Sequence, residues 1–134
     1  MSNEHCGKIL VAEDDRFITQ IYATKLGKAG FELVMVSDGR DVVPHMLREK
    51  PDLVLLDLMM PGKSGFDVLR DIKADPELKK IPVLVITALA QTKERELGLQ
   101  LGAKDYIIKS DHSIQEIIAK ITRYCDQCGI TRKA

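Results

Sequence analysis

The chain has 134 residues, with 20 lysines and arginines against 20 aspartates and glutamates, so its formal net charge is zero. That length suits one compact domain, and 45% hydrophobic residues suffice for a core, which excludes global disorder. Without a basic surplus, direct binding to nucleic acid is disfavoured. The N-terminus lacks the apolar stretch of a signal peptide, and every apolar run is too short to cross a bilayer. We therefore expect a cytoplasmic protein without membrane contact.

Short apolar runs alternate with amphipathic segments in the first half of the chain. An apolar run over 9–12 predicts a strand. Apolar residues spaced by three and four over 17–29 predict the helix that follows, and Gly30 is a typical helix end. A second run over 33–36 predicts the next strand, and the spacing over 42–47 predicts a second helix.

The same alternation continues to the C-terminus. Three more apolar runs predict strands over 53–56, 83–86 and 106–108. Helical spacing predicts helices over 66–72 and 114–125, and the polar segment 93–101, interrupted by Gly98, is assigned as the helix between the last two strands. Continuous apolar strands that alternate with helices favour a parallel sheet buried on both faces. We predict an α/β fold: a doubly wound, five-stranded parallel sheet of flavodoxin-like order 2-1-3-4-5, with five helices on its two faces.

Chemically distinctive side chains follow four of the predicted strands, namely Glu13 with Asp14, then Asp57, Thr87 and Lys109. Ligands bind at the carboxyl edge of such a sheet, where the strand order reverses, so we expect the three carboxylates to converge there. Clustered carboxylates need a cation to stay ionised, and oxygen ligands with room for water suit Mg²⁺. Beside such a metal, Asp57 can become an aspartyl-phosphate whose oxygens the ammonium and the hydroxyl would hold.

Each of these residues also has a purely structural interpretation. Acidic residues after a strand often cap the next helix, which applies to Asp14 and Asp15. Thr87 could begin a helix, and Lys109 could be an ordinary solvated lysine. The occurrence of all the required groups at strand ends favours the site. The Cys-x-x-Cys sequence at 125–128 would need two more ligands to bind zinc, so we interpret its cysteines as tail residues.

Four ordered segments resemble the receiver domains of bacterial response regulators. They match the opening strand with its acidic residues, the phosphoacceptor strand with its loop, the threonine-bearing strand and the lysine-bearing strand of that family. In this chain they lie at 8–15, 52–65, 82–88 and 102–109. Because the resemblance covers nearly the whole chain, we expect a receiver domain over residues 8–124 and short tails over 1–7 and 125–134.

The resemblance implies a role for each matching residue. Asp57 would be the phosphoacceptor. Asp14 would bind Mg²⁺ directly, Glu13 would do so directly or through water, and the backbone carbonyl of Met59 would be another ligand. Met59 and Leu89 depart mildly from the family pattern, because both are apolar where many relatives carry a polar side chain at one of the two positions.

Three further positions follow from the same resemblance. Thr87 and Lys109 would contact the phosphoryl group. Tyr106 occupies the position of an aromatic switch residue that changes rotamer with Thr87, and a core tyrosine with a solvated hydroxyl is the alternative. Ser110 follows the lysine where relatives carry proline, often after a cis peptide bond. A cis bond before serine is costly, so the geometry of this loop is open.

The combined prediction is a phosphoacceptor of two-component signalling. A histidine kinase or phosphotransfer protein would supply the phosphoryl group. A surface change, on the face of the fourth helix, fifth strand and fifth helix, would pass the signal to a downstream protein. We expect a monomer or a weak, phosphorylation-dependent dimer. We expect no enzymatic activity beyond catalysis of its own phosphotransfer and dephosphorylation.

Three alternatives stay open at this point. The chain could be a docking or dimerisation module that acts without phosphorylation. It could be an aspartyl-phosphate phosphatase related to haloacid dehalogenases, although those enzymes carry Asp-x-Asp where this chain has Glu13-Asp14-Asp15. It could also be the receiver fragment of a longer hybrid protein.

Overall fold

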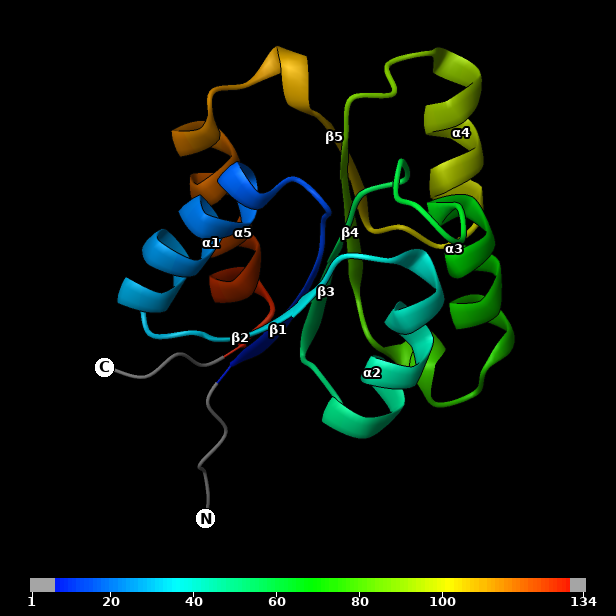
Figure 1. Ribbon diagram of the computed structural model, residues 1–134, viewed down its shortest axis with the longest axis horizontal. Helices are drawn as coiled ribbons and strands as arrows, with labels where there is room; N and C mark the ends of the chain where they lie inside the picture. Colours follow the sequence, from blue (N-terminus) through cyan, green and yellow to red (C-terminus); the bar gives the residue numbers. More distant parts are fainter. Residues whose placement is uncertain (1–6, 131–134) are drawn as a thin grey trace.

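One parallel sheet forms the centre of the computed structural model, which describes residues 7–130 (Figure 1). Its strands are β1 (Lys8–Ala12), β2 (Glu32–Val36), β3 (Leu53–Leu56), β4 (Val83–Thr87) and β5 (Asp105–Ile108). They lie in the order β2-β1-β3-β4-β5, and each neighbouring pair is parallel. This arrangement confirms the predicted flavodoxin-like fold.

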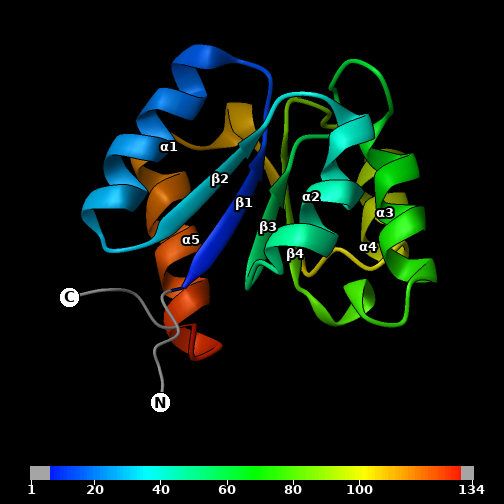
Figure 2. The same cartoon turned by 60° about the horizontal axis from the view of Figure 1, so that its bottom comes forward.

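Helices cover both faces of the sheet (Figures 1 and 2). One face carries α1 (Arg16–Lys28) and α5 (Ile114–Gln127), and the other carries α2 (Val42–Glu49), α3 (Gly65–Ala74) and α4 (Thr92–Gln100). Side chains of β1 alternate between the two apolar cores. Ile9 and Val11 belong to the core under α1 and α5, and Leu10 and Ala12 belong to the other. Burial on both faces explains why the strands are continuous apolar runs.

Capping side chains fix where three of the helices begin. Asp15 Oδ1 accepts hydrogen bonds from the amides of Phe17 and Ile18 at 2.9 and 3.2 Å, so α1 begins directly after Asp15. Ser64 caps α3, and Ser113 caps α5 in a reciprocal capping box. Of the two acidic residues that sequence offered as helix caps, Asp15 is the one that caps α1.

The last helix extends beyond the predicted start of the C-terminal tail. α5 runs to Gln127, and Cys125 is fully buried in the core under α1 and α5. Cys128, at the end of the helix, is exposed. The interpretation of Cys125 as a tail residue was therefore wrong, because this position continues the apolar stripe of α5. Residues 1–6 and 131–134 of the predicted tails lie outside the described residues.

The loop after β5 is short and regular. Lys109–Asp111 forms a single 3-10 turn, and the backbone from residue 7 to residue 130 contains no cis peptide bond. Ser110 therefore sits in a turn that does not need the cis proline of the family pattern. None of the helices described is long and apolar enough to cross a membrane.

Candidate functional site

Backbone pairing of β1 and β3 places two carboxylates next to each other. Ala12 lies opposite Leu56 at the ends of these strands, and the amide of Asp57 donates to the carbonyl of Ala12 at 3.0 Å. Glu13 is held in line with β1 because its amide donates to the carbonyl of Val36 at 3.0 Å. Glu13 and Asp57 therefore leave the sheet side by side at its carboxyl edge, as the sequence predicted.

Three carboxylates converge at this edge. One oxygen each from Glu13, Asp14 and Asp57 can be chosen so that all three lie within 4.8 Å of one another. Glu13 and Asp57 are only 4% and 5% exposed, whereas Asp14 is exposed. Oxygen donors that are clustered but open to solvent on one side suit a hard divalent cation that keeps some of its water. The residues present therefore fit Mg²⁺.

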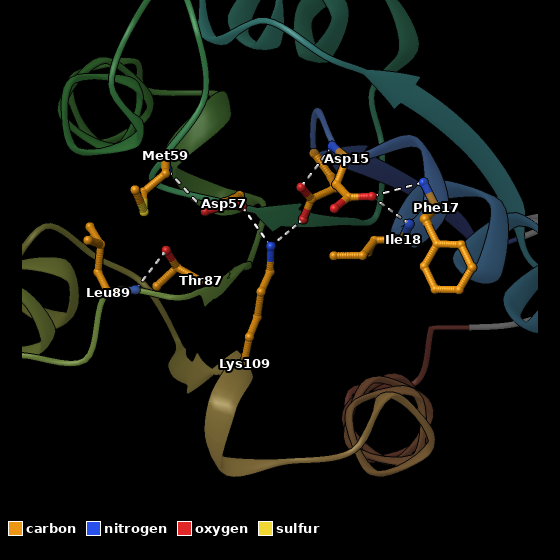
Figure 3. Close-up of polar contacts among 9 residues, drawn as sticks. Asp15, Phe17, Ile18, Asp57, Met59, Thr87, Leu89 and Lys109 are labelled. Carbon is orange, nitrogen blue, oxygen red and sulfur yellow. Dashed lines mark hydrogen bonds and ion pairs between the residues drawn. The ribbon is translucent and has the colours of Figure 1, made fainter.

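Lys109 bridges the two buried carboxylates, and Figure 3 shows its side chain reaching Asp57. Its Nζ lies 2.7 Å from Glu13 Oε1 and 2.8 Å from Asp57 Oδ2. Burial lowers the pKa of Lys109, but the hydrogen bonds that its ammonium donates to both carboxylates outweigh burial and hold that pKa above its usual value. Burial raises the pKa of Glu13 in spite of the ammonium. One ammonium against three carboxylates leaves two negative charges uncompensated.

The remaining carboxylate oxygens accept backbone hydrogen bonds. Asp57 Oδ1 accepts from the amide of Met59 at 3.0 Å, and Glu13 Oε2 accepts from the amide of Asp15 at 3.1 Å. The loop after Asp57 returns tightly to α3, because the amide of Gly65 donates to the carbonyl of Leu58 at 3.1 Å. A Cβ at Gly65 would lie 2.5 Å from Leu58 Cα, so this close approach requires glycine.

Thr87 and Tyr106 meet at the loop that follows β4. Thr87 is fully buried, and its Oγ1 accepts from the amide of Leu89 at 3.4 Å (Figure 3). The hydroxyl of Tyr106 donates to the carbonyl of Leu89 at 2.9 Å, so it lies against protein rather than in solvent. The Tyr106 ring packs on Gly98 of α4, where an added Cβ would lie 3.0 Å from the ring. Tyr106 is thus held inward, beneath α4.

Comparison with known proteins identifies the architecture. The model of the response regulator receiver domain family matches residues 9–122. The chain belongs to this family. The BeF₃-activated N-terminal receiver domain of Klebsiella pneumoniae RstA is 35% identical, with a TM-score of 0.77, over 86% of this chain and 95% of that chain.

Two further receiver structures bear on the site. The phosphorylated cyanobacterial phytochrome response regulator RcpA is 31% identical, with a TM-score of 0.72, over 90% of this chain and 92% of that chain. The Mn²⁺-bound form of response regulator Rcp1 is 27% identical, with a TM-score of 0.78, over 96% of this chain and 99% of that chain. The chain is therefore a receiver domain of two-component signalling, a class that is phosphorylated on aspartate.

Apolar side chains flank Asp57 in this receiver domain. Met59 is 54% exposed, and Leu89 is partly buried against the core under α2, α3 and α4. Figure 3 shows both on the side of Asp57 opposite Phe17 and Ile18. Neither Met59 nor Leu89 carries a side-chain group that can bind a water molecule strongly.

Two features of the site were missed at the sequence level. A groove of about 220 Å³ adjoins Lys109 between α1 and α5, and Phe17 and Ile114 are among its lining residues. The exposed fraction of Phe17, 73%, was not predicted, because the helical spacing assigns it to the apolar face. The second feature is the buried hydroxyl of Tyr22, a residue that lines a small cavity together with Glu13 and Asp57. The sequence shows only a tyrosine within the apolar face of the predicted helix, and this pattern does not show whether the hydroxyl reaches solvent.

Proposed function

We propose that this receiver domain takes a phosphoryl group from a histidine kinase or a phosphotransfer protein onto Asp57, with Mg²⁺ bound. The observation that carries the proposal is the bridging of Asp57 and Glu13 by Lys109 beside the solvent-facing Asp14. A buried nucleophilic carboxylate, a fixed ammonium and a partly open cation site are the groups that phosphoryl transfer to an aspartate requires.

The proposed step is an in-line displacement. A carboxylate oxygen of Asp57 bonds to phosphorus while the phosphorus–nitrogen bond of the donor's phosphohistidine breaks, and the imidazole keeps the electron pair and takes up a proton. The ammonium of Lys109 is 2.8 Å from Asp57 Oδ2, which places it to contact the oxygens of the incoming group. The hydroxyl of Thr87 would contact those oxygens from the end of β4.

The metal would be held by Glu13, Asp14, Asp57 and the backbone carbonyl of Met59. When bound, Mg²⁺ supplies positive charge that offsets the negative charge of the phosphoryl oxygens. Hydrolysis of the aspartyl-phosphate would return the domain to its starting state through the same residues, so the chain would act on no substrate other than its own phosphoryl group.

Signalling would begin at Thr87. A phosphoryl group that draws the Thr87 hydroxyl toward Asp57 weakens its contact with the amide of Leu89, whose carbonyl holds Tyr106. The change would therefore reach the face made by α4, β5 and α5, where a downstream protein would read it. The apolar groove supports a protein donor, because its side chains offer contact area beside Lys109, which contacts Asp57.

Intact-mass measurement after incubation with acetyl phosphate and Mg²⁺ tests the proposal. We expect the parent to gain about 80 Da, the mass of one phosphoryl group. Asp57→Asn should gain nothing, and Asp71→Asn, an exposed aspartate on α3, should behave as the parent. A gain that persists in Asp57→Asn would contradict the assignment. A parent that gains no mass would support a docking module that acts without phosphorylation.

A further inference from the structure

The hydroxyl of Tyr22 is buried without a hydrogen-bond partner. Tyr22 lies on α1 and is 2% exposed, and its hydroxyl oxygen is the one buried side-chain polar atom within residues 7–130 that finds no partner. An unpaired buried hydroxyl destabilises a fold, and phenylalanine would fill the same space without that cost. The hydroxyl is thus a group that the unphosphorylated state does not use.

The surroundings of this hydroxyl point to the acidic pair. Tyr22 lines a small cavity together with Glu13, Asp57, Val11 and Leu55, on the α1 side of the sheet. The cavity has no room for a water molecule, and the hydroxyl oxygen itself is buried. Backbone groups of β1 and β3 are engaged in the sheet, which leaves the two carboxylates as acceptors. Burial raises the pKa of Tyr22, and the charges of Glu13 and Asp57 raise it further, so the phenol keeps its proton.

Phosphorylation changes which of these carboxylates needs a donor. In the unphosphorylated state each oxygen of Glu13 already accepts one hydrogen bond, from Lys109 and from the amide of Asp15. Phosphorylated Asp57 is an acyl phosphate whose negative charge lies on the phosphoryl oxygens, so the ammonium that bridged the pair would turn to those oxygens. Glu13, 4% exposed, would then keep the amide of Asp15 and the proposed cation but lose the ammonium as a hydrogen-bond donor. A buried carboxylate that loses such a donor gains much from a replacement.

We propose that Tyr22 is a positioning residue whose hydroxyl donates to the Glu13 carboxylate once Lys109 contacts the phosphoryl group. This inference rests on the proposed function, because it needs Lys109 to leave Glu13 on phosphorylation. The new bond would stabilise the phosphorylated state over the unphosphorylated one. It would also hold Glu13 in the orientation that the cation site requires.

Beryllofluoride, a mimic of the bound phosphoryl group, tests the inference at saturating Mg²⁺. We expect Tyr22→Phe to weaken beryllofluoride binding about tenfold by calorimetry, the factor that one hydrogen bond to a charged acceptor represents. Urea unfolding in EDTA should show that Tyr22→Phe is as stable as the parent or more so. The matched control is Tyr124→Phe on α5, which should bind as the parent does.

Nuclear magnetic resonance identifies the acceptor in the same complex. A slowly exchanging hydroxyl proton should appear on beryllofluoride binding, with a nuclear Overhauser contact to the side chain of Glu13, and it should be absent in Tyr22→Phe. Equal beryllofluoride affinities for parent and Tyr22→Phe would overturn the inference and leave the proposed function intact. So would a loss of stability in EDTA without a loss of affinity. A parent that does not bind beryllofluoride would overturn the proposed function, and the inference with it.

Discussion

Replacement of Lys109 by methionine removes the ammonium and keeps most of the side-chain volume. Glu13 and Asp57 would each lose a charge-assisted hydrogen bond, of 2.7 and 2.8 Å respectively, while staying buried. Breaking a buried ion pair by removing one partner costs about 3–5 kcal/mol. Lys109 itself is 22% exposed at an edge that water reaches, so we expect the lower end, about 3 kcal/mol.

Urea unfolding in EDTA at neutral pH measures this loss. With a urea dependence of about 1.5 kcal/mol per molar, the midpoint of Lys109→Met should fall by about 2 M. The control is Lys80→Met, because Lys80 pairs with Glu77 while 71% exposed, and surface changes of this kind stay within about 0.5 kcal/mol. A Lys109→Met midpoint within experimental error of the parent would refute the assignment of Lys109 as the counter-ion of the buried pair.

Added Mg²⁺ separates this explanation from a general loss of packing. The ammonium contacts one oxygen each of Glu13 and Asp57, two of the three residues of the cation site, so its removal should tighten Mg²⁺ binding. Stabilisation by a ligand grows with its concentration relative to its Kd. Lys109→Met should therefore regain more stability than the parent gains at the same Mg²⁺ concentration. Weaker Mg²⁺ binding by the variant would show that the lysine and the metal do not share those oxygens.

Three other predictions concern the phosphoryl lifetime, the metal and the cysteines. The aspartyl-phosphate of the parent should hydrolyse several-fold to about 100-fold more slowly than that of a Met59→Asn, Leu89→Glu double variant, because apolar side chains cannot orient water. Equal rates of phosphoryl loss after the donor is removed would contradict this. Asp14→Ala should lose Mg²⁺ binding by titration yet unfold in EDTA at the same or a higher urea concentration, since one of three like charges is gone. With single-thiol proteins, Cys128 should react with a thiol reagent in the native state and Cys125 only after unfolding.

The sequence was sufficient for the sheet and for the convergence of the acidic residues. Apolar runs mark the strands because both faces are buried, and parallel strands bring their carboxyl ends to one edge. The position of Asp57 after β3 and of Glu13 after β1 follows from those two facts alone. The family resemblance, confirmed by the comparison, supplied the expected roles of the individual residues.

Contacts within the site were beyond the reach of sequence. Nothing in the pattern shows that Lys109 bridges Glu13 and Asp57, because that distance depends on the turn after β5. The unpaired hydroxyl of Tyr22 could not be predicted either. Helical spacing assigns Tyr22 to the buried face of α1, but it does not show which groups surround the hydroxyl. The predicted helix over 114–125 ended two residues before Gln127, because the residues after Cys125 are polar and continue no apolar stripe. Cys125 was assigned to the tail as well, although it packs as a small apolar residue.

Glu13 and Asp57 lie on the same face of the sheet. The site therefore tolerates aliphatic substitutions in β1 but not the insertion or deletion of a residue there. Side chains of a strand change face at every residue, and Val11 and Glu13 lie on the α1 side because two positions separate them. Inserting or deleting one residue within β1 would place the Glu13 carboxylate in the apolar core under α2, α3 and α4. Exchange of one aliphatic residue for another along β1 leaves this parity intact. Aliphatic substitutions in β1 therefore leave the position of Glu13 unchanged, whereas the number of residues in β1 cannot change without moving Glu13 to the other face.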